Sequence, residues 1–216
     1  MGSKAYYQIC LDLTGRLCLV VGGGAVGERK VLGLLEAGAR VRLVCPSCTQ
    51  KLRDMASSGE VEWIADSYRS EHGDGVSLVI GATNDREVNE RIAEDARRRG
   101  LEVNIVDMPD LCSFIVPALH RMGPLQIAVS SGGASPVIAG RVRDRIKECV
   151  GEEYAVLAEC LRVKRERLRT VDANRKHAFW QSVRTLDIAK YAGRHDELGL
   201  EVDRLLEKAL RGESAS

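Results

Sequence analysis

Three glycines near the start of the chain have the spacing of a dinucleotide-binding turn. Gly22, Gly24 and Gly27 follow a short apolar segment, residues 16–21, and open a segment with helical periodicity. The first glycine permits a tight turn, the second lets the backbone approach a pyrophosphate, and the third lets helix and strand pack closely. A helix that begins here also presents unpaired N–H groups to the phosphates. The residues predicted to bind a dinucleotide through this turn are Gly22, Gly23, Gly24, Ala25 and Val26.

The end of the second predicted strand lacks the acidic residue that usually binds the ribose of NAD. Val44, Cys45 and Pro46 stand there, about twenty residues beyond the glycine turn. None of them offers a carboxylate to the ribose hydroxyls, and none is an arginine that would attract a 2′-phosphate. These three residues are predicted cofactor contacts, and the spacing alone leaves NAD and NADP both open.

Polar residues follow two further apolar segments. Thr83 comes directly after residues 77–82 and is a predicted cofactor contact, whereas Asp85 is expected to cap the next helix. Asn104 and Asp107 lie around the end of the strand after that helix. Because parallel strands end at one edge of their sheet, we expect these side chains on the same edge as the glycine turn.

The carboxylate of Asp107 is the candidate catalytic group. A carboxylate beside a nicotinamide ring can act as a general base or can orient a substrate. The alternative is that Asp107 only forms a turn before Pro109. The residues alone leave both interpretations open.

Strand and helix signals alternate through the first half of the chain. The predicted strands are residues 16–21, 41–45, 61–65, 77–82 and 101–106, and the predicted helices are residues 25–37, 52–58 and 87–99. Pro46 is expected to end the second strand. Short strands that alternate with helices of this length indicate βαβ units, so we predict a Rossmann-type α/β domain with a parallel sheet.

The pattern changes in the second half. Residues 114–119 and 125–130 are predicted strands with no helix between them, and helices are predicted from Val137 onward. We expect an NAD-binding domain at residues 1–114, a small α+β segment for dimerisation and substrate binding at residues 115–150, and a helical domain at residues 151–216. The elements after residue 114 are too small to bury their apolar faces alone, which predicts a homodimer.

The composition is that of an ordinary globular protein. Of the 216 residues, 44% are hydrophobic and 29% are charged, which excludes a disordered chain. No apolar run approaches the roughly 20 residues that a membrane helix needs, so no membrane partner is expected. The basic run at residues 162–176 could face nucleic acid, but the net charge is only +1 and aromatic residues make up only 4% of the chain. We expect a solvated helix face there and no nucleic-acid partner.

Seven cysteines without an export signal indicate reduced thiols and a cytoplasmic protein. Cys45 and Cys48 form a C-x-x-C sequence, which can bind a metal or take part in redox chemistry. A zinc site would need a second pair of ligands, which the sequence does not offer, so no metal site is predicted. The favoured interpretation is two small residues in a turn after a strand.

Several stretches of the chain, taken in order, resemble the precorrin-2 dehydrogenase family, which is also described as the amino-terminal part of sirohaem synthase. They are residues 11–13, 20–30, 81–85 with 88–89, 103–107 with Phe114 and 117–118, and 127–136 with Arg143. The stretch 127–136 is the most specific, because a bare Rossmann domain has no need of it. Two departures concern the cofactor site. Residues 45–48 stand where relatives typically have Ala-Pro-Glu, and Gly27 replaces the more usual alanine.

The resemblance implies a homodimeric enzyme that oxidises precorrin-2, a tetrapyrrole, to sirohydrochlorin with NAD as the acceptor. Asp107 would then be the general base or would orient the substrate. The residues expected to bind the substrate are Asn104, Ser130, Gly132, Gly133, Ser135 and Arg143. Arg141 and Lys147 would add positive charge that attracts the carboxylates of the macrocycle. For each of the three basic residues the alternative is a surface salt bridge.

Two other functions remain open. Some members of the family also insert ferrous iron, which calls for His or carboxylate groups near the macrocycle. His120 is the histidine nearest in sequence to the substrate segments, and its alternative role is packing. A non-catalytic module that senses the NAD redox state is the second alternative, although a sensor would need neither Asp107 nor residues 130–136. A short-chain reductase is disfavoured because Tyr154 and Tyr191 have no Lys four residues later.

Overall fold

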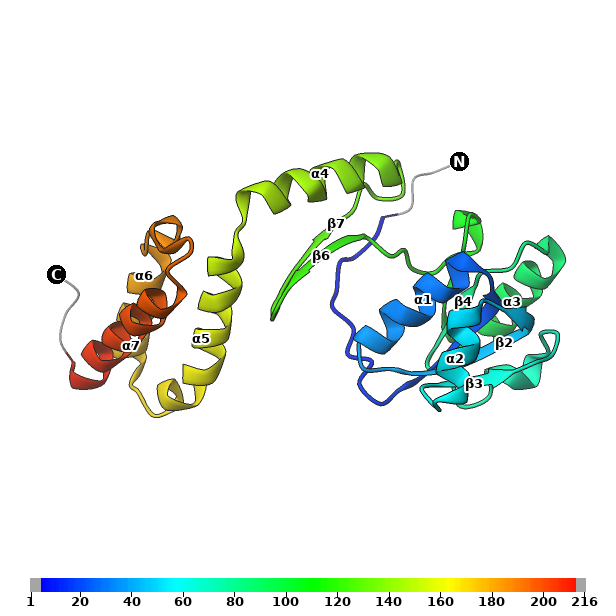
Figure 1. Ribbon diagram of the computed structural model, residues 1–216, viewed down its shortest axis with the longest axis horizontal. Helices are drawn as coiled ribbons and strands as arrows, with labels where there is room; N and C mark the ends of the chain where they lie inside the picture. The colour runs from blue at the N-terminus through cyan, green and yellow to red at the C-terminus, as the bar shows by residue number, and fades with distance from the viewer. Residues whose placement is uncertain (1–4, 213–216) are drawn as a thin grey trace. The chain divides into compact units, whose positions relative to one another are not determined.

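The computed structural model describes residues 5–212 (Figure 1). The chain divides into two compact units, Met1–Val116 and Pro117–Ser216. The first unit contains a five-stranded sheet and its helices, and the second contains a hairpin followed by helices.

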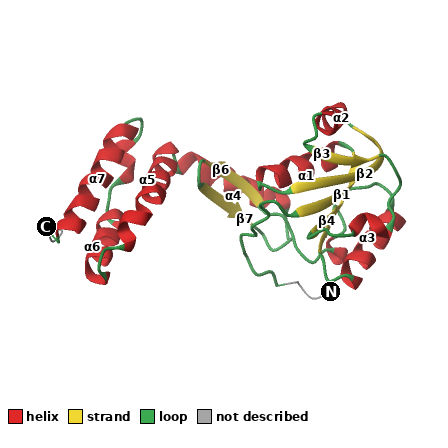
Figure 2. Ribbon diagram, turned by 90° about the horizontal axis from the view of Figure 1, so that it is seen from below, coloured by secondary structure: helices red, strands yellow, loops and turns green. Residues whose placement is uncertain are grey.

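Five parallel strands form the sheet of the first unit, in the order β3-β2-β1-β4-β5. The strands are β1 (Leu17–Gly23), β2 (Arg40–Cys48), β3 (Val61–Ile64), β4 (Leu78–Gly81) and β5 (Glu102–Ile105), and the helices are α1 (Ala25–Glu36), α2 (Gln50–Ser57) and α3 (Arg86–Arg98), with 3₁₀ turns at Ser70–Gly73 and Pro109–Leu111. The strand order reverses between β1 and β4, which is where open α/β sheets bind ligands. The predicted Rossmann-type sheet is confirmed (Figure 2).

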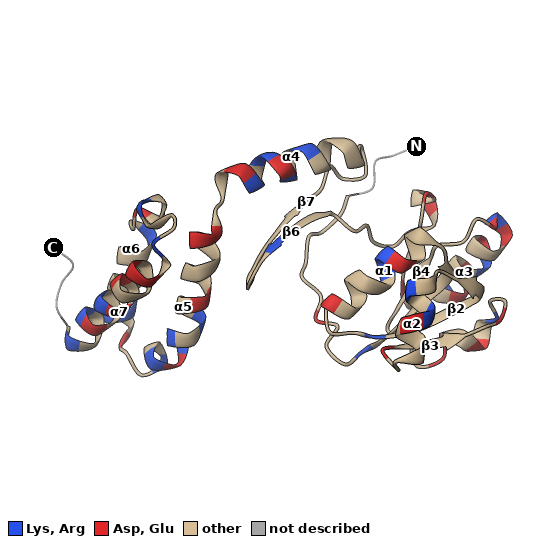
Figure 3. Ribbon diagram, in the orientation of Figure 1, with Lys and Arg blue, Asp and Glu red and all other residues tan. Residues whose placement is uncertain are grey.

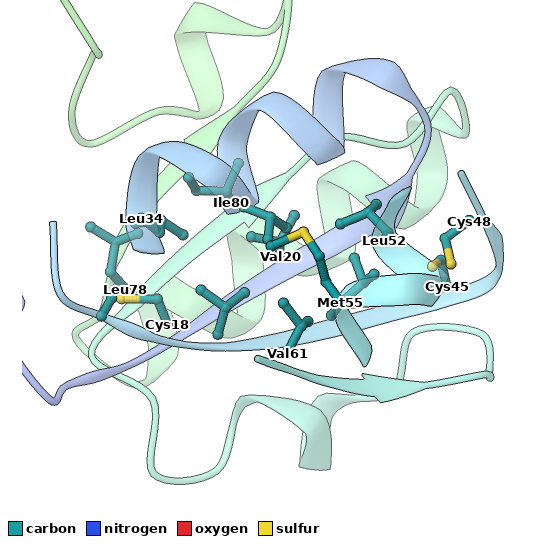
Figure 4. Close-up of a cluster of buried hydrophobic side chains, with 14 of the residues drawn as sticks. Cys18, Val20, Leu34, Cys45, Cys48, Leu52, Met55, Val61, Leu78 and Ile80 are labelled. Atoms are coloured by element: carbon teal, nitrogen blue, oxygen red, sulfur yellow. The ribbon is translucent and has the colours of Figure 1, made fainter. Parts of the chain in front are cut away.

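Alternate residues of β1 fill two separate cores, one on each face of the sheet. Cys18 and Val20 pack with side chains of α1 and α2, and Figure 4 shows Val20 in this cluster. Leu19 and Val21 pack on the opposite face with side chains of α3. Each fully buried side chain of this size stabilises the fold by about 1.5–3 kcal/mol relative to leaving it exposed. Burial on both faces explains why the central strands are continuously apolar.

The second strand does not end at Pro46, contrary to the prediction. It continues to Cys48, and its register with β1 shifts after Val44, so that three residues of β2 stand opposite one residue of β1. Proline has no N–H to donate to a neighbouring strand, and such a bulge tolerates it. The ring N–H of Trp63 donates to the carbonyl of Cys45 at 3.1 Å and fastens β3 to the bulge.

The second unit begins with an antiparallel hairpin and continues with four helices. The hairpin strands are β6 (Ala118–Met122) and β7 (Leu125–Val129), and the helices are α4 (Pro136–Cys149), α5 (Glu152–Arg169), α6 (Ala173–Arg184) and α7 (His195–Arg211), with a 3₁₀ turn at Ile188–Tyr191. The predicted strand at residues 114–119 therefore starts too early. The Phe114 carbonyl instead accepts a hydrogen bond from the Asn104 amide at 3.0 Å, and Pro117 has no N–H to pair in a hairpin.

Helices α5, α6 and α7 surround a core of their own. Its buried members are Leu157, Leu168, Phe179, Val183, Leu198, Val202, Leu206 and Ala209. Phe179 is only 1% exposed and meets the ring of Trp180 edge-on, with 5.1 Å between the ring centroids. Leu157 and Leu168 of α5 thus face this core.

The basic run at residues 162–176 is interleaved with acidic partners (Figure 3). Lys164 on α5 pairs with Asp203 at 3.1 Å, and Arg167 pairs with Glu207 at 2.7 Å, so α5 and α7 are joined by ion pairs as well as by their core. Exposed pairs of this kind stabilise by only about 0.2–1 kcal/mol each. Within residues 5–212, no helix is both long enough and apolar enough to cross a membrane.

Leu206 and Leu200 lie on the same helix, α7, and differ in burial, since Leu206 is 0% exposed and Leu200 is 70% exposed. We expect Leu206→Ala to lower the free energy of unfolding by about 2–5 kcal/mol, because it leaves a cavity in the helical core. Leu200→Ala is the matched control and should change it by less than about 0.5 kcal/mol. Urea unfolding followed by helical circular dichroism measures both, and equal effects would contradict this core.

Candidate functional site

The predicted cofactor residues lie along one edge of the sheet in the first unit. Strands β1, β2, β4 and β5 are parallel, so the segments that follow them share the carboxyl edge. This edge carries the glycine turn, the bulge of β2, the loop of Thr83 and the turn of Asp107. The sequence prediction that these segments share an edge is confirmed.

Main-chain contacts shape the glycine turn. Gly22 has φ +113°, and a Cβ on it would lie 2.3 Å from the carbonyl oxygen of Ala82 in the loop after β4. A Cβ on Gly27 would lie 2.0 Å from the carbonyl oxygen of Gly22. No side chain fits at either position, so α1 starts in direct contact with the end of β1.

The space in front of Gly24 is open. A Cβ on Gly24 would meet no atom within 4 Å, in contrast to its neighbours in the turn. Gly24 is also the N-cap residue of α1 and has no side chain to cap the helix, so the first N–H groups of the helix are available to a ligand. Unpaired N–H groups at the positive end of a helix, with free space before them, suit a pyrophosphate.

Thr49 connects the glycine turn to the end of β2. Its N–H donates to the carbonyl of Gly23 at 3.0 Å, and its hydroxyl donates to the Glu28 carboxylate of α1 at 2.6 Å. The same hydroxyl accepts from the Leu52 N–H and caps α2. Sequence reasoning did not single out Thr49, although a threonine directly before a helix is a typical N-cap signal.

The Thr83 side chain is held within its own loop. Its hydroxyl lies 3.0 Å from Oδ1 of the buried Asn89 and accepts from the Asp85 N–H at 3.2 Å. Asp85 accepts from the Val88 N–H at 3.1 Å, which confirms the predicted cap of α3. The hydroxyl of Thr83 is therefore a rigid feature of the edge.

Asp107 follows β5 in a left-handed backbone conformation. Its φ is 58°, the one positive φ at a non-glycine residue within residues 5–212. Aspartate tolerates this region better than most residues, and such conformations cluster at functional sites. The side chain is exposed at the carboxyl edge, so Asp107 both shapes the turn and presents its carboxylate.

Lys30 is a residue of this edge that sequence reasoning did not assign to the site. It lies on α1, half-buried, and its Nζ is 3.5 Å from Oδ1 of Asn104 on β5. Burial and then the charge of Arg29 lower the pKa of Lys30, while the Asp107 carboxylate acts in the opposite direction. Lys30 therefore links the cofactor helix to Asn104 on β5. Its position three residues after Gly27, on the buried face of α1, was the available signal.

The other predicted substrate residues lie in the second unit, around the start of α4. Gly132 and Gly133 have φ of 64° and 87°, and the Gly132 N–H donates to the Ser130 hydroxyl at 3.1 Å. Ser135 is the N-cap of α4 and accepts from the Ile138 N–H. The serine hydroxyls thus shape this turn.

The basic residues predicted to attract the substrate lie further along α4. Arg143 pairs with its neighbour Asp144 at 2.6 Å, which is the surface salt bridge foreseen as its alternative role. Arg141 and Lys147 are exposed.

Two family models match separate parts of the chain. Residues 9–118 match the model of a family described as "Putative NAD(P)-binding". The chain belongs to this NAD(P)-binding family. Residues 123–148 match a second family, described as "Sirohaem biosynthesis protein central". The first match confirms the prediction that the cofactor is a nicotinamide dinucleotide, either NAD or NADP.

Relatives of this NAD(P)-binding protein include siroheme synthases. That of Methylococcus capsulatus is 40% identical over 184 residues, which are 84% of this chain and 38% of that protein. That of Pseudomonas paraeruginosa is 39% identical over 205 residues, which are 93% of this chain and 43% of that protein. The chain thus spans about two fifths of the length of these relatives.

One solved structure matches both units. SirC, a precorrin-2 dehydrogenase, is 25% identical with a TM-score of 0.75, and the match covers 92% of this chain and all of that one. Together with the family matches, this confirms the resemblance to the precorrin-2 dehydrogenase and sirohaem synthase family.

Replacing Gly24 tests the cofactor turn. Gly24→Asp should bring a negative charge to the open space where a pyrophosphate would lie, so we expect NAD affinity to fall at least about a hundredfold, given the strength of unpaired charges at a desolvated site. Gly24→Asn is the matched control of similar size without charge and should bind more tightly than Gly24→Asp. Calorimetric titration of both folded variants with NAD measures the two affinities. Equal affinity of Gly24→Asp and the unsubstituted protein would contradict the site.

Proposed function

We propose that this protein oxidises precorrin-2 to sirohydrochlorin with NAD as the acceptor. The observation that carries the proposal is the shared carboxyl edge, which holds both the open dinucleotide turn and the exposed carboxylate of Asp107. The similarity to SirC, a precorrin-2 dehydrogenase, supports the choice of substrate.

The main chain of the glycine turn would hold the pyrophosphate of NAD. The residues expected around the cofactor are Gly22, Gly23, Gly24, Ala25, Val26, Val44, Cys45, Pro46 and Thr83. The bound nicotinamide supplies an acceptor for hydride. The choice of NAD over NADP follows the resemblance to precorrin-2 dehydrogenases, because the bulge of β2 itself carries neither a carboxylate nor an arginine for the ribose.

Asp107 is proposed to accept the proton that the reduced macrocycle loses. Removal of a hydride and a proton extends the conjugation of the tetrapyrrole, so the protein must supply a base at the edge where the cofactor lies. The positive-φ main-chain conformation of Asp107 fixes the position from which its carboxylate extends. Asn104, held by Lys30, is proposed as a substrate ligand.

The start of α4 is proposed to bind the substrate carboxylates. Ser135 begins this helix, and its N-terminal N–H groups and partial positive charge suit an anion. The residues proposed to bind these carboxylates are Ser130, Gly132, Gly133, Ser135 and Arg143. Arg143 would exchange its solvent-exposed partner, Asp144, for a substrate carboxylate, an exchange that costs little because exposed pairs are weak.

Asp107→Asn is the sharpest test of the catalytic role. Asparagine keeps the size and tolerates the same positive φ, so charge is removed without the strain that alanine would add. We expect turnover to fall by about two to four orders of magnitude while NAD affinity is kept. An absorbance assay with precorrin-2 and NAD measures this. Turnover within a few-fold of the unsubstituted protein would leave Asp107 as a turn residue only, and an inactive unsubstituted protein that binds NAD would favour the sensor alternative.

We also propose that the protein is a homodimer. Three apolar side chains of α4 are exposed, with Val137 70%, Ile138 54% and Val142 44% exposed, and Ile138 and Val142 lie one helical turn apart on one side of the helix. Water contact with such a face is unfavourable, and a second copy would remove it.

Light scattering of the full chain tests the dimer. We expect twice the mass of the 23.7 kDa chain at micromolar concentration, and dissociation of the Ile138→Asp variant. Leu200→Asp, on the exposed side of α7, is the control and should not change the mass. A monomeric unsubstituted chain would overturn the proposal.

Iron insertion is the second candidate activity, and His120 is the observation that favours it. Its Nε2 atom is buried and has no hydrogen-bond partner. A buried imidazole nitrogen without a partner calls for an explanation, and such a nitrogen can ligate a metal or accept a pyrrole proton. Incubation with sirohydrochlorin and Co²⁺ against a blank without enzyme tests it. An acceleration that His120→Ala abolishes would establish the second activity.

The cysteines support the proposed cytoplasmic location. All seven are free thiols, and four of them are buried. Free thiols are typical of proteins in a reducing compartment.

A further inference from the structure

Cys45 and Cys48 lie together at the carboxyl end of β2, where an NAD site usually has an acidic residue. Figure 4 shows their sulfur atoms next to each other. Both are free thiols, with Cys45 5% and Cys48 8% exposed. The reaction proposed above uses neither sulfur.

A regular strand would keep this pair apart. Residues three apart on a strand point to opposite faces and lie about 10 Å from each other, whereas a disulfide needs Cα atoms closer than about 7 Å. The bulge of β2 removes this separation. A Cβ placed on Gly23 would lie 2.6 Å from Sγ of Cys45 and 2.5 Å from Cβ of Cys48, so both side chains rest against one main-chain position.

The surroundings of Cys45 disfavour its thiolate form. Burial, and then the neighbouring Cys48, raise the pKa of Cys45 to about 11, and a hydrogen bond between the two thiols adds to this. Cys45 therefore stays protonated at neutral pH, and we assign the first attack to the Cys48 sulfur. Pro46 and Ser47, between them, are exposed, so a small oxidant can reach the bulge from solvent.

We propose that Cys45 and Cys48 form a reversible disulfide site that reacts with peroxides and controls the affinity of the neighbouring dinucleotide turn. The site needs both cysteines and also the bulge of β2, which brings their side chains together. The disulfide itself does not depend on the function proposed above, whereas its effect on affinity rests on the proposed cofactor.

The chemistry balances with hydrogen peroxide as the oxidant. The Cys48 sulfur attacks one peroxide oxygen, the O–O bond breaks, and the leaving hydroxide takes a proton to become water. Cys45 then attacks the sulfur of the resulting sulfenic acid, loses its proton, and displaces a second water. Two thiols lose two electrons and two protons in total, and one peroxide becomes two waters. A small thiol can reverse the bond by exchange.

Closing this bond would disturb the glycine turn. The Cys45 sulfur rests on Gly23, and Thr49, next to Cys48, donates to the Gly23 carbonyl at 3.0 Å. Formation of the disulfide would move the Cys45 and Cys48 side chains, which contact the glycine turn at Gly23. We expect NAD to bind about tenfold more weakly to the oxidised protein, within the usual range for two coupled sites.

The experiment follows the bond and the affinity separately in the full chain. Protein is treated with hydrogen peroxide, remaining thiols are alkylated, and trypsin releases residues 43–51, which contain Cys45, Cys48 and no other cysteine. We expect this peptide to become two hydrogens lighter and to escape alkylation, and a small thiol to restore it. Calorimetry then compares NAD affinity before and after oxidation.

Two variants serve as controls. Cys48→Ser should form no internal bond and should lose the effect of peroxide on NAD affinity, whereas Cys10→Ser, at an exposed cysteine elsewhere, should keep both. A peptide that stays fully alkylated after peroxide would overturn the disulfide. A disulfide that leaves NAD affinity unchanged would overturn the coupling. A reduced protein that binds no NAD would instead contradict the cofactor proposed above, and the peptide result would stand independently.

Discussion

Main chain meets main chain at the end of β1, and no side chain fits between them. The carbonyl of Gly22 occupies the place where a side chain on Gly27 would begin, and the carbonyl of Ala82 does the same for Gly22. This contact fixes the first residue of α1 and the angle at which the helix packs against the sheet. It therefore leaves the first N–H groups of the helix free, and it brings Lys30, one turn later, to Asn104. A larger residue at either glycine would force the neighbouring main chain to shift.

Much of the first unit could be predicted because its signals are local. Short apolar strands, glycine stops and helical periodicity predict five parallel strands and three helices within a few residues of their bounds. The errors fall where a distant partner changes the local preference. The second strand continues past Pro46 because the bulge leaves no partner that would need an N–H from the proline. Phe114 stays out of the hairpin because its carbonyl accepts a hydrogen bond from the Asn104 side chain.

The site residues missed from the sequence have the same explanation. Lys30 is important because of a residue 74 positions away, and Thr49 because of one 21 positions away. Neither distance can be read from spacing along the chain. Asp107 differs, since it forms a turn and also exposes its carboxylate in the folded chain. Only a few residue types can fill both roles, and aspartate is one of them.

The two tryptophans of the chain fall one in each unit, Trp63 on β3 and Trp180 on α6. Trp63 donates its ring N–H to the main chain of the β2 bulge, while Trp180 stacks edge-on against the helical core. The fluorescence emission of an indole ring changes with its hydrogen bonding and burial. Each unit therefore contains one fluorescent tryptophan, and replacing one tryptophan by phenylalanine would leave a fluorescence signal that reports on the other unit alone.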